Sequence, residues 1–423
     1  MDQKPGYKLT KLGWIPEDWE MEQLDFVTPN GEKYGIVDGP FGSNLKTIHY
    51  RNSGVPIITS GYVTEGVFHA DEYLYVDQEL FEREKRSSVK GGDIVMAKIG
   101  ARCGASAILP KDHQTGILSG NALKISVDET RHSNFYVWSW LWYLYQTRKI
   151  ELLKTVGAQP AISMSSLKKY KLPIPPLPEQ QKIAQILSTW DKAITKTEEL
   201  IKQNQKRKQG LMQQLLTGKK RFREFDKSWQ VLKVKEVADV DKESLGSNTA
   251  TSYSFRYISL SDVEDGRVSN SLPTLEFGLA PSRARRIVKK GSVIMATVRP
   301  NLQGFAKIKS DENDLIASTG FAVLDVRENF SSNYLFHYLF SHHMTKQIDS
   351  LIVGSNYPAI NSKEVKNLKI NIPSYSEQQK IASVLSSADQ EINSLQNQLG
   401  KLKEQKKGLM QKLLTGEVRV KID

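Results

Sequence analysis

Cysteine is nearly absent from this sequence of 423 residues, and so are long uninterrupted apolar runs. The single thiol, Cys103, excludes an internal disulfide and is expected to be a small buried residue in a reducing compartment. No apolar stretch is long enough to span a bilayer, and the opening MDQKPGYKLTKLGWIPEDWE lacks the apolar core of a signal peptide. The sequence therefore predicts a soluble, cytoplasmic protein.

Signatures of catalysis and of metal binding are missing as well. No G-x-x-x-x-G-K-[ST] phosphate loop occurs, and the Asn/Asp-Pro-Pro-aromatic loop of an amino-methyltransferase is absent, as is its glycine-rich cofactor turn. Glu364-Val365-Lys366 has the Glu-x-Lys shape of some nucleases, but no convincing Pro-Asp precedes it. The seven histidines and one cysteine show no structural-zinc spacing. We therefore predict no catalytic residue, no metal ligand and no cofactor bound by this chain.

Positive charge, in contrast, is in excess. Lysine and arginine number 59 against 47 aspartates and glutamates, which gives a formal net charge of +12 and a pI near 9.3. Such a balance favours a polyanionic partner, either nucleic acid or an acidic membrane surface.

One long segment of the sequence is repeated. Glu179–Gly218 reads EQQKIAQILSTWDKAITKTEELIKQNQKRKQGLMQQLLTG, and Glu377–Gly416 reads EQQKIASVLSSADQEINSLQNQLGKLKEQKKGLMQKLLTG. The offset between the copies is constant, since 377 − 179 and 416 − 218 both equal 198. A repeat of this length without insertion or deletion indicates two copies of one structural unit.

Each copy carries a 3.5-residue apolar period, which is typical of a left-handed coiled coil. The apolar positions of this seam are Ile183, Leu187, Trp190, Ile194, Ile201, Leu211 and Leu215 in the first copy, and Ile381, Leu385, Ile392, Leu395, Leu399, Leu402, Leu409 and Leu413 in the second. Thr197, Asn204 and Lys208 are polar residues on the same seam. We predict that the two helices pair antiparallel; two ordinary long core helices are the alternative.

The register of that pairing follows from the repeat. If its centre lies near Thr197 and Leu395, Trp190 lies against Leu402 and Asn204 lies near Ala388. The polar seam residues weaken a two-helix contact, so we expect helices of other subunits to complete a four-helix bundle.

The repeated helices divide the chain into four parts: a globular domain over 1–178, a helix over 179–218, a second globular domain over 219–376, and a helix with a short tail over 377–423. In the first domain, strand-like runs such as Val55–Ser60, Gly92–Ile99 and Ala122–Val127 alternate with turn residues. The aromatic stretch Asn134–Lys149 is expected to be a helix that packs on a sheet, although its rings are also of a kind that stacks on bases. The proline-rich Lys171–Pro178 predicts a stiff hinge.

Core-like segments of the first domain recur in the second. GDIVMAKI at Gly92–Ile99 is echoed by GSVIMATV at Gly291–Val298, and Pro160-Ala161-Ile162 by Pro358-Ala359-Ile360. The offset drifts between such segments, so the insertions lie in loops. The predicted fold class is α/β: two similar mixed α/β recognition domains, separated by two long helices that form an antiparallel coiled coil, with an internal pseudo-twofold repeat.

Arginine, lysine, asparagine and glutamine in turn-rich segments suit contacts with phosphates and base edges. We predict DNA contacts in the first domain from Ser43, Asn44, Lys46, Arg51, Arg83, Lys85, Arg86, Lys98 and Arg102. In the second domain we predict them from loop residues Arg256, Arg267, Arg283, Arg285, Arg286, Arg299, Asn301 and Gln303. Two readers at a fixed separation suit a DNA target made of two different half-sites. A solvated surface charge is the alternative role for each residue.

The order of these parts resembles the specificity subunit of type I restriction–modification systems. GWIPEDWE near the start, GPFGSNLK, the helix entry PLPEQQKIA and the helix exit LLTGKKRF all resemble that family, and the similarity covers essentially the whole chain. One departure is Tyr375-Ser376, where the first copy has Leu177-Pro178. The resemblance implies a non-catalytic subunit that binds double-stranded DNA through two target recognition domains, with no membrane partner.

The same resemblance implies the partners and the division of chemistry among them. The helices at Glu179–Gly218 and Glu377–Gly416 would dock two methyltransferase subunits, and motor–nuclease restriction subunits would then join. S-adenosylmethionine, ATP and magnesium are expected on those subunits. Two alternatives from other classes are a methyltransferase or fused nuclease, and a purely structural coiled-coil adaptor; the adaptor leaves two large basic domains unexplained.

Overall fold

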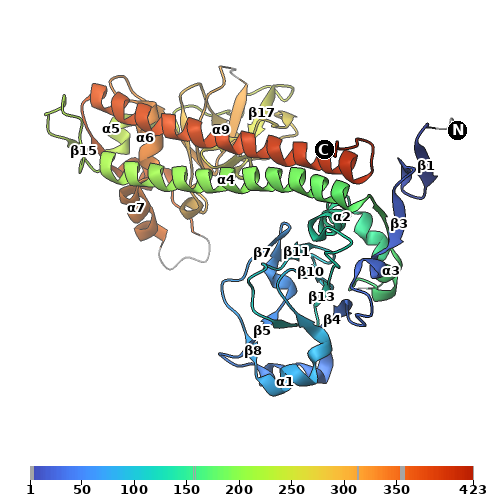
Figure 1. Ribbon diagram of the computed structural model, residues 1–423. Coiled ribbons are helices and arrows are strands. Elements are labelled where there is room, and N and C mark those ends of the chain that lie inside the picture. Colours follow the sequence, from blue (N-terminus) through green and yellow to red (C-terminus); the bar gives the residue numbers. More distant parts are fainter. Residues whose placement is uncertain (1–3, 156, 158, 312–313, 353–357, 423) are drawn as a thin grey trace. The chain divides into compact units, whose positions relative to one another are not determined.

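The computed structural model describes residues 4–155, 157, 159–311, 314–352 and 358–422, without the side chain of Ser43. It divides into two compact units, Met1–Lys196 with Leu399–Asp423, and Thr197–Gln398. Each unit contains one globular domain and a part of both long helices (Figure 1). Within the described ranges, no helix is long and apolar enough to cross a membrane.

Two four-stranded sheets form the centre of unit 1. The first has the order β11-β10-β13-β4, formed by Ser106–Ile108, Ile94–Ala97, Ala122–Ile125 and Ile36–Asp38. The second has the order β8-β5-β12-β9, formed by Tyr75–Val76, Val55–Ile58, Gly116–Leu118 and Ser88–Val89. The predicted strands at 55–60, 92–99 and 122–127 are all present. Every residue of β10 and β13 is buried, which is why their sequences are continuously apolar except for Lys124.

Smaller strands and short helices complete unit 1. Two-stranded ribbons are formed by β1 (Tyr7–Thr10) with β2 (Gly13–Pro16), β3 (Glu20–Gln23) with β14 (Lys171–Ile174), and β6 (Val63–Thr64) with β7 (Val67–Phe68). The helices are α1 (Gln78–Arg83), α2 (Asn134–Gln146) and α3 (Met164–Lys169). The hinge predicted at 171–178 is therefore wrong: its first half is a strand fixed by pairing with β3, and its second half enters a helix.

The aromatic helix α2 packs into the core of unit 1. Trp138, Trp140, Trp142 and Tyr143 are all buried. The indole N–H of Trp138 donates to the Ser106 carbonyl oxygen at 3.0 Å, so even the polar edge of this ring is satisfied internally. Packing, and not stacking on bases, is the role of these rings.

Unit 2 repeats the sheet order strand by strand. Its first sheet is β16-β25-β22-β23, formed by Ala238–Val240, Phe321–Val326, Val293–Ala296 and Phe305–Lys307. Its second is β20-β17-β24-β21, formed by Thr274–Glu276, Ser254–Ile258, Leu315–Ser318 and Ala284–Ile287. The ribbons are β15 (Gln230–Lys233) with β26 (Lys369–Ile372), and β18 (Val263–Glu264) with β19 (Arg267–Val268). In both units the second sheet contains a single parallel pair, β5 with β12 and β17 with β24.

The helices of unit 2 are α5 (Val234–Val237), α6 (Ser332–Leu339), α7 (His342–Ile352) and α8 (Ser362–Asn367). The side chains of α6 take the place that α2 has in unit 1, with Tyr334 and Tyr338 fully buried. The prediction of two similar mixed α/β domains is therefore confirmed.

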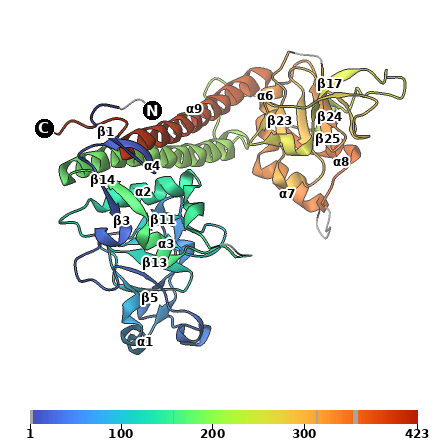
Figure 2. The ribbon, with the colours of Figure 1, turned by 90° about the vertical axis from the view of Figure 1, so that its right-hand side faces the viewer.

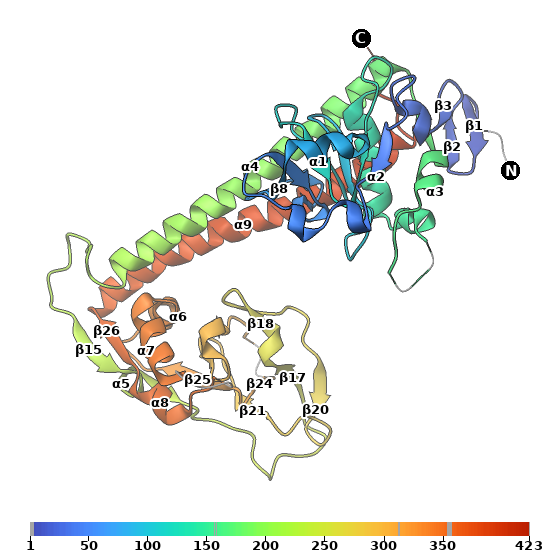
Figure 3. The same cartoon turned by 90° about the horizontal axis from the view of Figure 1, so that it is seen from below.

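Two long helices, α4 (Leu177–Leu215) and α9 (Tyr375–Leu414), account for the repeated segments. They lie side by side, α4 in green and α9 in red in Figures 2 and 3. In unit 1, Asp191 of α4 forms an ion pair with Lys406 of α9; in unit 2, Lys208 of α4 pairs with Asp389 of α9. A second pair in each unit gives the direction: Glu179 meets Arg419, just beyond α9, in unit 1, and Arg207 meets Glu391 in unit 2. Within each unit, residues earlier in α4 therefore meet residues later in the chain at α9, so the segments run antiparallel. The Trp190–Leu402 contact stays a prediction.

The seam residues face inward along both helices. Ile183, Leu187 and Leu215 of α4 are buried, as are Ile381, Leu385, Ile392 and Leu413 of α9. The other apolar seam positions, namely Trp190, Ile194, Ile201, Leu211, Leu395, Leu399, Leu402 and Leu409, are half-buried. Buried seam positions are more frequent toward the helix ends, although Thr197 in the middle of α4 and Ile392 in α9 are buried as well.

Candidate nucleic-acid interface

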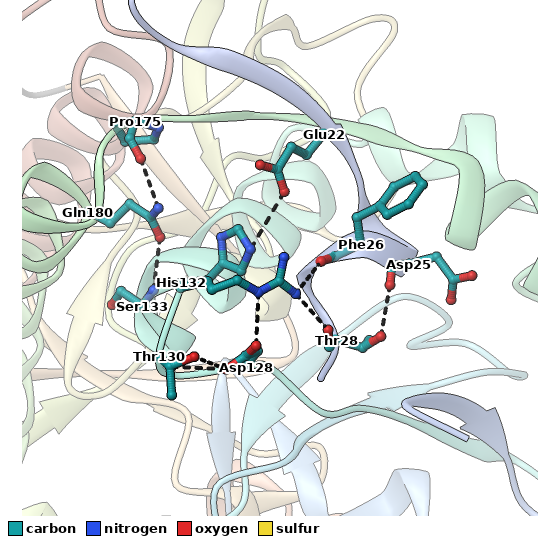
Figure 4. Close-up of polar contacts among 11 residues, drawn as sticks. Glu22, Asp25, Phe26, Thr28, Asp128, Thr130, His132, Ser133, Pro175 and Gln180 are labelled. Carbon is teal, nitrogen blue, oxygen red and sulfur yellow. Dashed lines mark hydrogen bonds and ion pairs between the residues drawn. The ribbon is translucent and has the colours of Figure 1, made fainter. Parts of the chain in front are cut away.

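Each long helix is fixed to its own globular domain by the glutamine that follows the repeated glutamate. In unit 1 the backbone N–H of Ser133 donates to Gln180 Oε1 at 2.8 Å, and Gln180 Nε2 donates to the Pro175 carbonyl oxygen at 2.8 Å (Figure 4). In unit 2 the amide of Gln378 makes the same two bonds, with the N–H of Ser331 at 2.9 Å and the Pro373 carbonyl oxygen at 3.0 Å. The glutamine therefore ties the helix start to the start of α2 or α6.

Neighbouring groups in Figure 4 connect the segment just before α2 to Glu22 of β3 and to the residues that follow β3. Asp128 accepts hydrogen bonds from Thr130 and Arg131, which together lower its pKa to about 2. The guanidinium of Arg131 also donates to the carbonyl oxygens of Phe26 and Thr28. Burial raises the pKa of Glu22 and lowers that of His132, whose Nε2 lies 3.6 Å from Glu22 Oε2. These contacts connect the segment that precedes α2 to the segment around β3.

The repeated glutamate is a buried anchor. Glu179, with a side chain 0% exposed, accepts hydrogen bonds from the Trp19 indole at 3.1 Å and from Arg419 at 2.7 Å. In unit 2, Glu377 is equally buried and accepts from Trp229 at 3.2 Å and from Arg221 at 2.8 Å. A buried carboxylate is tolerable only when it is paired and hydrogen-bonded, as here.

Sequence reasoning missed these junctions, although the signal was present. Arg221 and Arg419 both follow a repeated LLTG and are separated by the repeat offset of 198, as are Glu179 and Glu377. The pairing of an arginine after one helix with a glutamate at the start of the other is a tertiary contact. No periodicity of either segment indicates it.

In unit 1 the residues predicted to contact DNA are mostly exposed, but several already have partners. Arg51 pairs with Asp77 at 3.1 Å, Lys85 with Glu82 at 2.9 Å, and Lys98 with Asp38 at 2.5 Å. Arg102 donates to the Val63 carbonyl oxygen and to Thr64 Oγ1. Arg83 pairs with Glu84 at 3.7 Å and donates to the Asn44 carbonyl oxygen at 3.4 Å. Asn44, Lys46, Arg83 and Arg86 are all exposed, while the side chain of Ser43 lies outside what the structure describes.

In unit 2 the predicted loop location is wrong for four arginines. Arg256 is in β17, Arg267 begins β19, and Arg285 and Arg286 are in β21. Arg286 is held by Asp241 at 3.0 Å, and Arg285 lies over the Phe277 ring. Arg256, Arg285 and Arg286 are half-buried, and only Arg267 is exposed. Arg283, Arg299 and Asn301 are exposed in turns as predicted, and Gln303 is half-buried in the same turn as Arg299.

A basic hollow of about 290 Å³ brings two of these residues together in unit 2. Arg256 and Arg267 line it with Lys307 and Lys309, which were not predicted. Arg256 is held in a two-pronged pair by Asp314, at 2.7 and 2.8 Å. Burial, and then the neighbouring Lys309, lower the pKa of Lys307. An anionic group in this hollow would relieve the repulsion between the two lysines.

Among the described residues, no cluster of three or more histidine, cysteine or acidic side chains is arranged to hold a metal ion.

Residues 41–204 and 226–404 match the family described as the type I restriction modification DNA specificity domain. The chain belongs to this family. Specificity subunits of type I systems recognise DNA and are not themselves catalytic.

The chain is similar over nearly its whole length to known specificity subunits of nearly the same length. The type I restriction enzyme MjaVIII specificity subunit of Methanocaldococcus jannaschii is 25% identical over 96% of this chain and 94% of its own length. A putative MjaX specificity subunit of the same organism is 24% identical over 98% of this chain and 97% of its own. The crystal structure of the type I S subunit from M. genitalium has a TM-score of 0.59 at 15% identity, over 97% of this chain and 99% of that one.

Proposed function

We propose that this specificity subunit reads an asymmetric DNA target in two parts, one with each globular domain. The observation that carries the proposal is the strand-for-strand repeat of two sheets in two units whose connecting segments differ in length and residue type. A shared scaffold with different loops suits two readers of different sequences. The net charge of +12 supports a polyanionic partner. The chain is proposed to bind double-stranded DNA in the cytoplasm.

The long helices are proposed to set the spacing of the half-sites and to dock two methyltransferase subunits. Ile183, Leu187, Leu215, Ile381, Leu385 and Leu413 are excluded from direct docking because they are buried within their own units. Half-buried seam residues in the middle of the helices, such as Ile194, Ile201 and Leu399, and the exposed Leu200 leave apolar surface that further helices would cover. Restriction subunits would join through the methyltransferases, which would bind S-adenosylmethionine; ATP and magnesium would also be bound outside this chain.

An exchange of one domain tests the proposal. Replacement of residues 24–170 by the corresponding segment of a relative keeps β3, β14 and the hydrogen bonds Trp19–Glu179 and Gln180–Pro175 native. Ser133, whose backbone N–H donates to Gln180, lies in the exchanged segment, so the relative must supply that backbone N–H. We expect methylation mapping of the assembled methyltransferase to show one altered half-site and one unchanged half-site. Alteration of both half-sites contradicts independent reading, and failure of the wild-type chain to support methylation contradicts the docking role.

A further inference from the structure

A turn in unit 2, Arg299–Gln303, has an uncommon backbone. It connects β22 to β23, and its first and last residues have φ of 49° and 54°. Residues with side chains seldom adopt such left-handed values. The corresponding turn of unit 1 connects β10 to β11 through Gly100–Gly104, where both end positions are glycines with φ of 101° and 93°. Unit 1 therefore uses the residue suited to this backbone, whereas unit 2 retains two long polar side chains against that preference.

The tips of the two turns also differ. Cys103 in unit 1 is 1% exposed, but Leu302 at the corresponding place in unit 2 is 69% exposed. Beside it, Asn301 and Arg299 are exposed, and neither side chain has a hydrogen-bond or ion-pair partner within the described part of the chain. An apolar tip flanked by a free guanidinium and a free amide is thus presented to solvent.

The turn is held firmly from behind. The backbone N–H of Arg299 donates to the Pro358 carbonyl oxygen at 2.7 Å, and the N–H of Ile360 donates to the Thr297 carbonyl oxygen at 2.9 Å. Gln303 Nε2 donates to Thr345 Oγ1 of α7 at 3.4 Å. A turn fixed in this way loses little conformational freedom when it binds a partner.

We propose that Arg299–Gln303 is the element with which unit 2 reads base edges of its half-site in the major groove. The inference rests on the proposed function and names the residues that determine specificity. Arginine suits the O6 and N7 of guanine, asparagine suits the N6 and N7 of adenine, and an apolar tip suits the thymine methyl group. Arg299, Asn301 and Leu302 take these roles, and Gln303 is a positioning residue that fixes the turn on α7.

Selection from a random duplex library tests this assignment, with the full chain purified together with its methyltransferase subunits. Arg299→Gly places in unit 2 the residue type that unit 1 has in the same turn, so the backbone shape is retained and the melting temperature does not fall. We expect Arg299→Gly and Leu302→Ala each to reduce base preference about tenfold at one or two positions of a single half-site. The other half-site remains unchanged.

Val231→Ala is the matched control, because Val231 is 64% exposed on β15, in a different sheet of the same unit. It must leave both half-sites unchanged. Wild-type base preferences in both Arg299→Gly and Leu302→Ala overturn the reading role of the turn and leave the proposed function intact. A wild-type complex that selects no bipartite motif overturns the proposed function itself, and the inference with it.

Discussion

Each unit has a junction in which a buried glutamate binds a tryptophan and an arginine, and the two units connect these residues in different ways. In unit 2, α4 ends at Leu215 and the chain runs on through Gly218 and Arg221 to Trp229, so helix and domain are covalently joined. In unit 1 the corresponding partners, Gly416 and Arg419, are at the other end of the chain from Trp19. Gly218 and Gly416 both have φ of +71° and both lie against the tryptophan of their own unit.

In unit 1, where the C-terminal tail is held to the domain without a covalent link, the tail makes additional hydrogen bonds. Arg419 donates not only to Glu179 but also to both carboxylate oxygens of Asp18 at 2.9 Å, and the Tyr7 hydroxyl donates to the Gly416 carbonyl oxygen at 3.1 Å. Corresponding junctions thus differ in how much they rely on the salt bridge. A covalent link holds the partners together in unit 2, whereas only side-chain contacts hold them in unit 1.

Removal of the junction arginines gives the largest expected effect. Arg221→Ala and Arg419→Ala each leave a buried carboxylate without its cation, which should lower the unfolding free energy more than the other substitutions described below. Only Arg419→Ala should also release the C-terminal tail, because the linker in unit 2 is covalently held at both ends. Denaturant unfolding and proteolysis of the tail measure the two effects.

The control neutralises the orphaned carboxylate. Arg221→Ala combined with Glu377→Gln should recover part of the lost stability, as should Arg419→Ala combined with Glu179→Gln. Equal protease sensitivity of the tail in the wild type and in Arg419→Ala would show that the salt bridge does not hold it.

A buried histidine of α6 should make the stability of unit 2 sensitive to acid. His337 of α6 is 2% exposed, with Asp389 and Ser386 of α9 beside its ring. Burial is the main cause that lowers its pKa to about 4; Lys208 and Lys307 lower it further, and Asp389 opposes them. The folded state therefore binds fewer protons than the unfolded state, whose histidine pKa is about 6.5.

Stability should consequently fall as the pH drops from about 6.5 to 4, by up to roughly 3 kcal/mol from this group. The residue at the repeat offset in unit 1 is Ser139, which does not titrate. His337→Ser should flatten the acid limb of unfolding free energy against pH, while His69→Ser, at a side chain 72% exposed, should not. If His337→Ser loses as much unfolding free energy between pH 6.5 and 4 as the wild type does, other groups cause the loss.

The smallest expected effect separates DNA contact from structural charge on β21 and the turn before it. Arg283 is exposed, whereas Arg286 is paired with Asp241. Arg283→Ala should weaken DNA binding and reduce the slope of log affinity against log salt by about 1, the effect of losing one phosphate contact. Arg286→Ala should lower stability and leave the slope unchanged. Identical slopes for the wild type and Arg283→Ala would place Arg283 away from the phosphates.

The sequence by itself determined the large features of this protein. The two long helices could be predicted because apolar residues such as Ile183 and Leu187, and their counterparts in the second copy, recur with a 3.5-residue period that is visible in the sequence. Core strands such as Ile94–Ala97 are continuously apolar because both faces are buried, so their repeat could be found by inspection.

Only the tertiary structure decided which polar residues are internal. Glu179 and Gln180 are residue types typical of a solvated surface, yet both are buried, and their partners Arg419 and Ser133 lie far away in the sequence. The ion pair of Arg286 likewise depends on a distant partner, Asp241, which follows β16. The fold also decides that Leu302 is exposed while Cys103, at the corresponding position of unit 1, is buried. Periodicity reports the environment of a residue along its own element; contacts between distant elements are set when the chain packs.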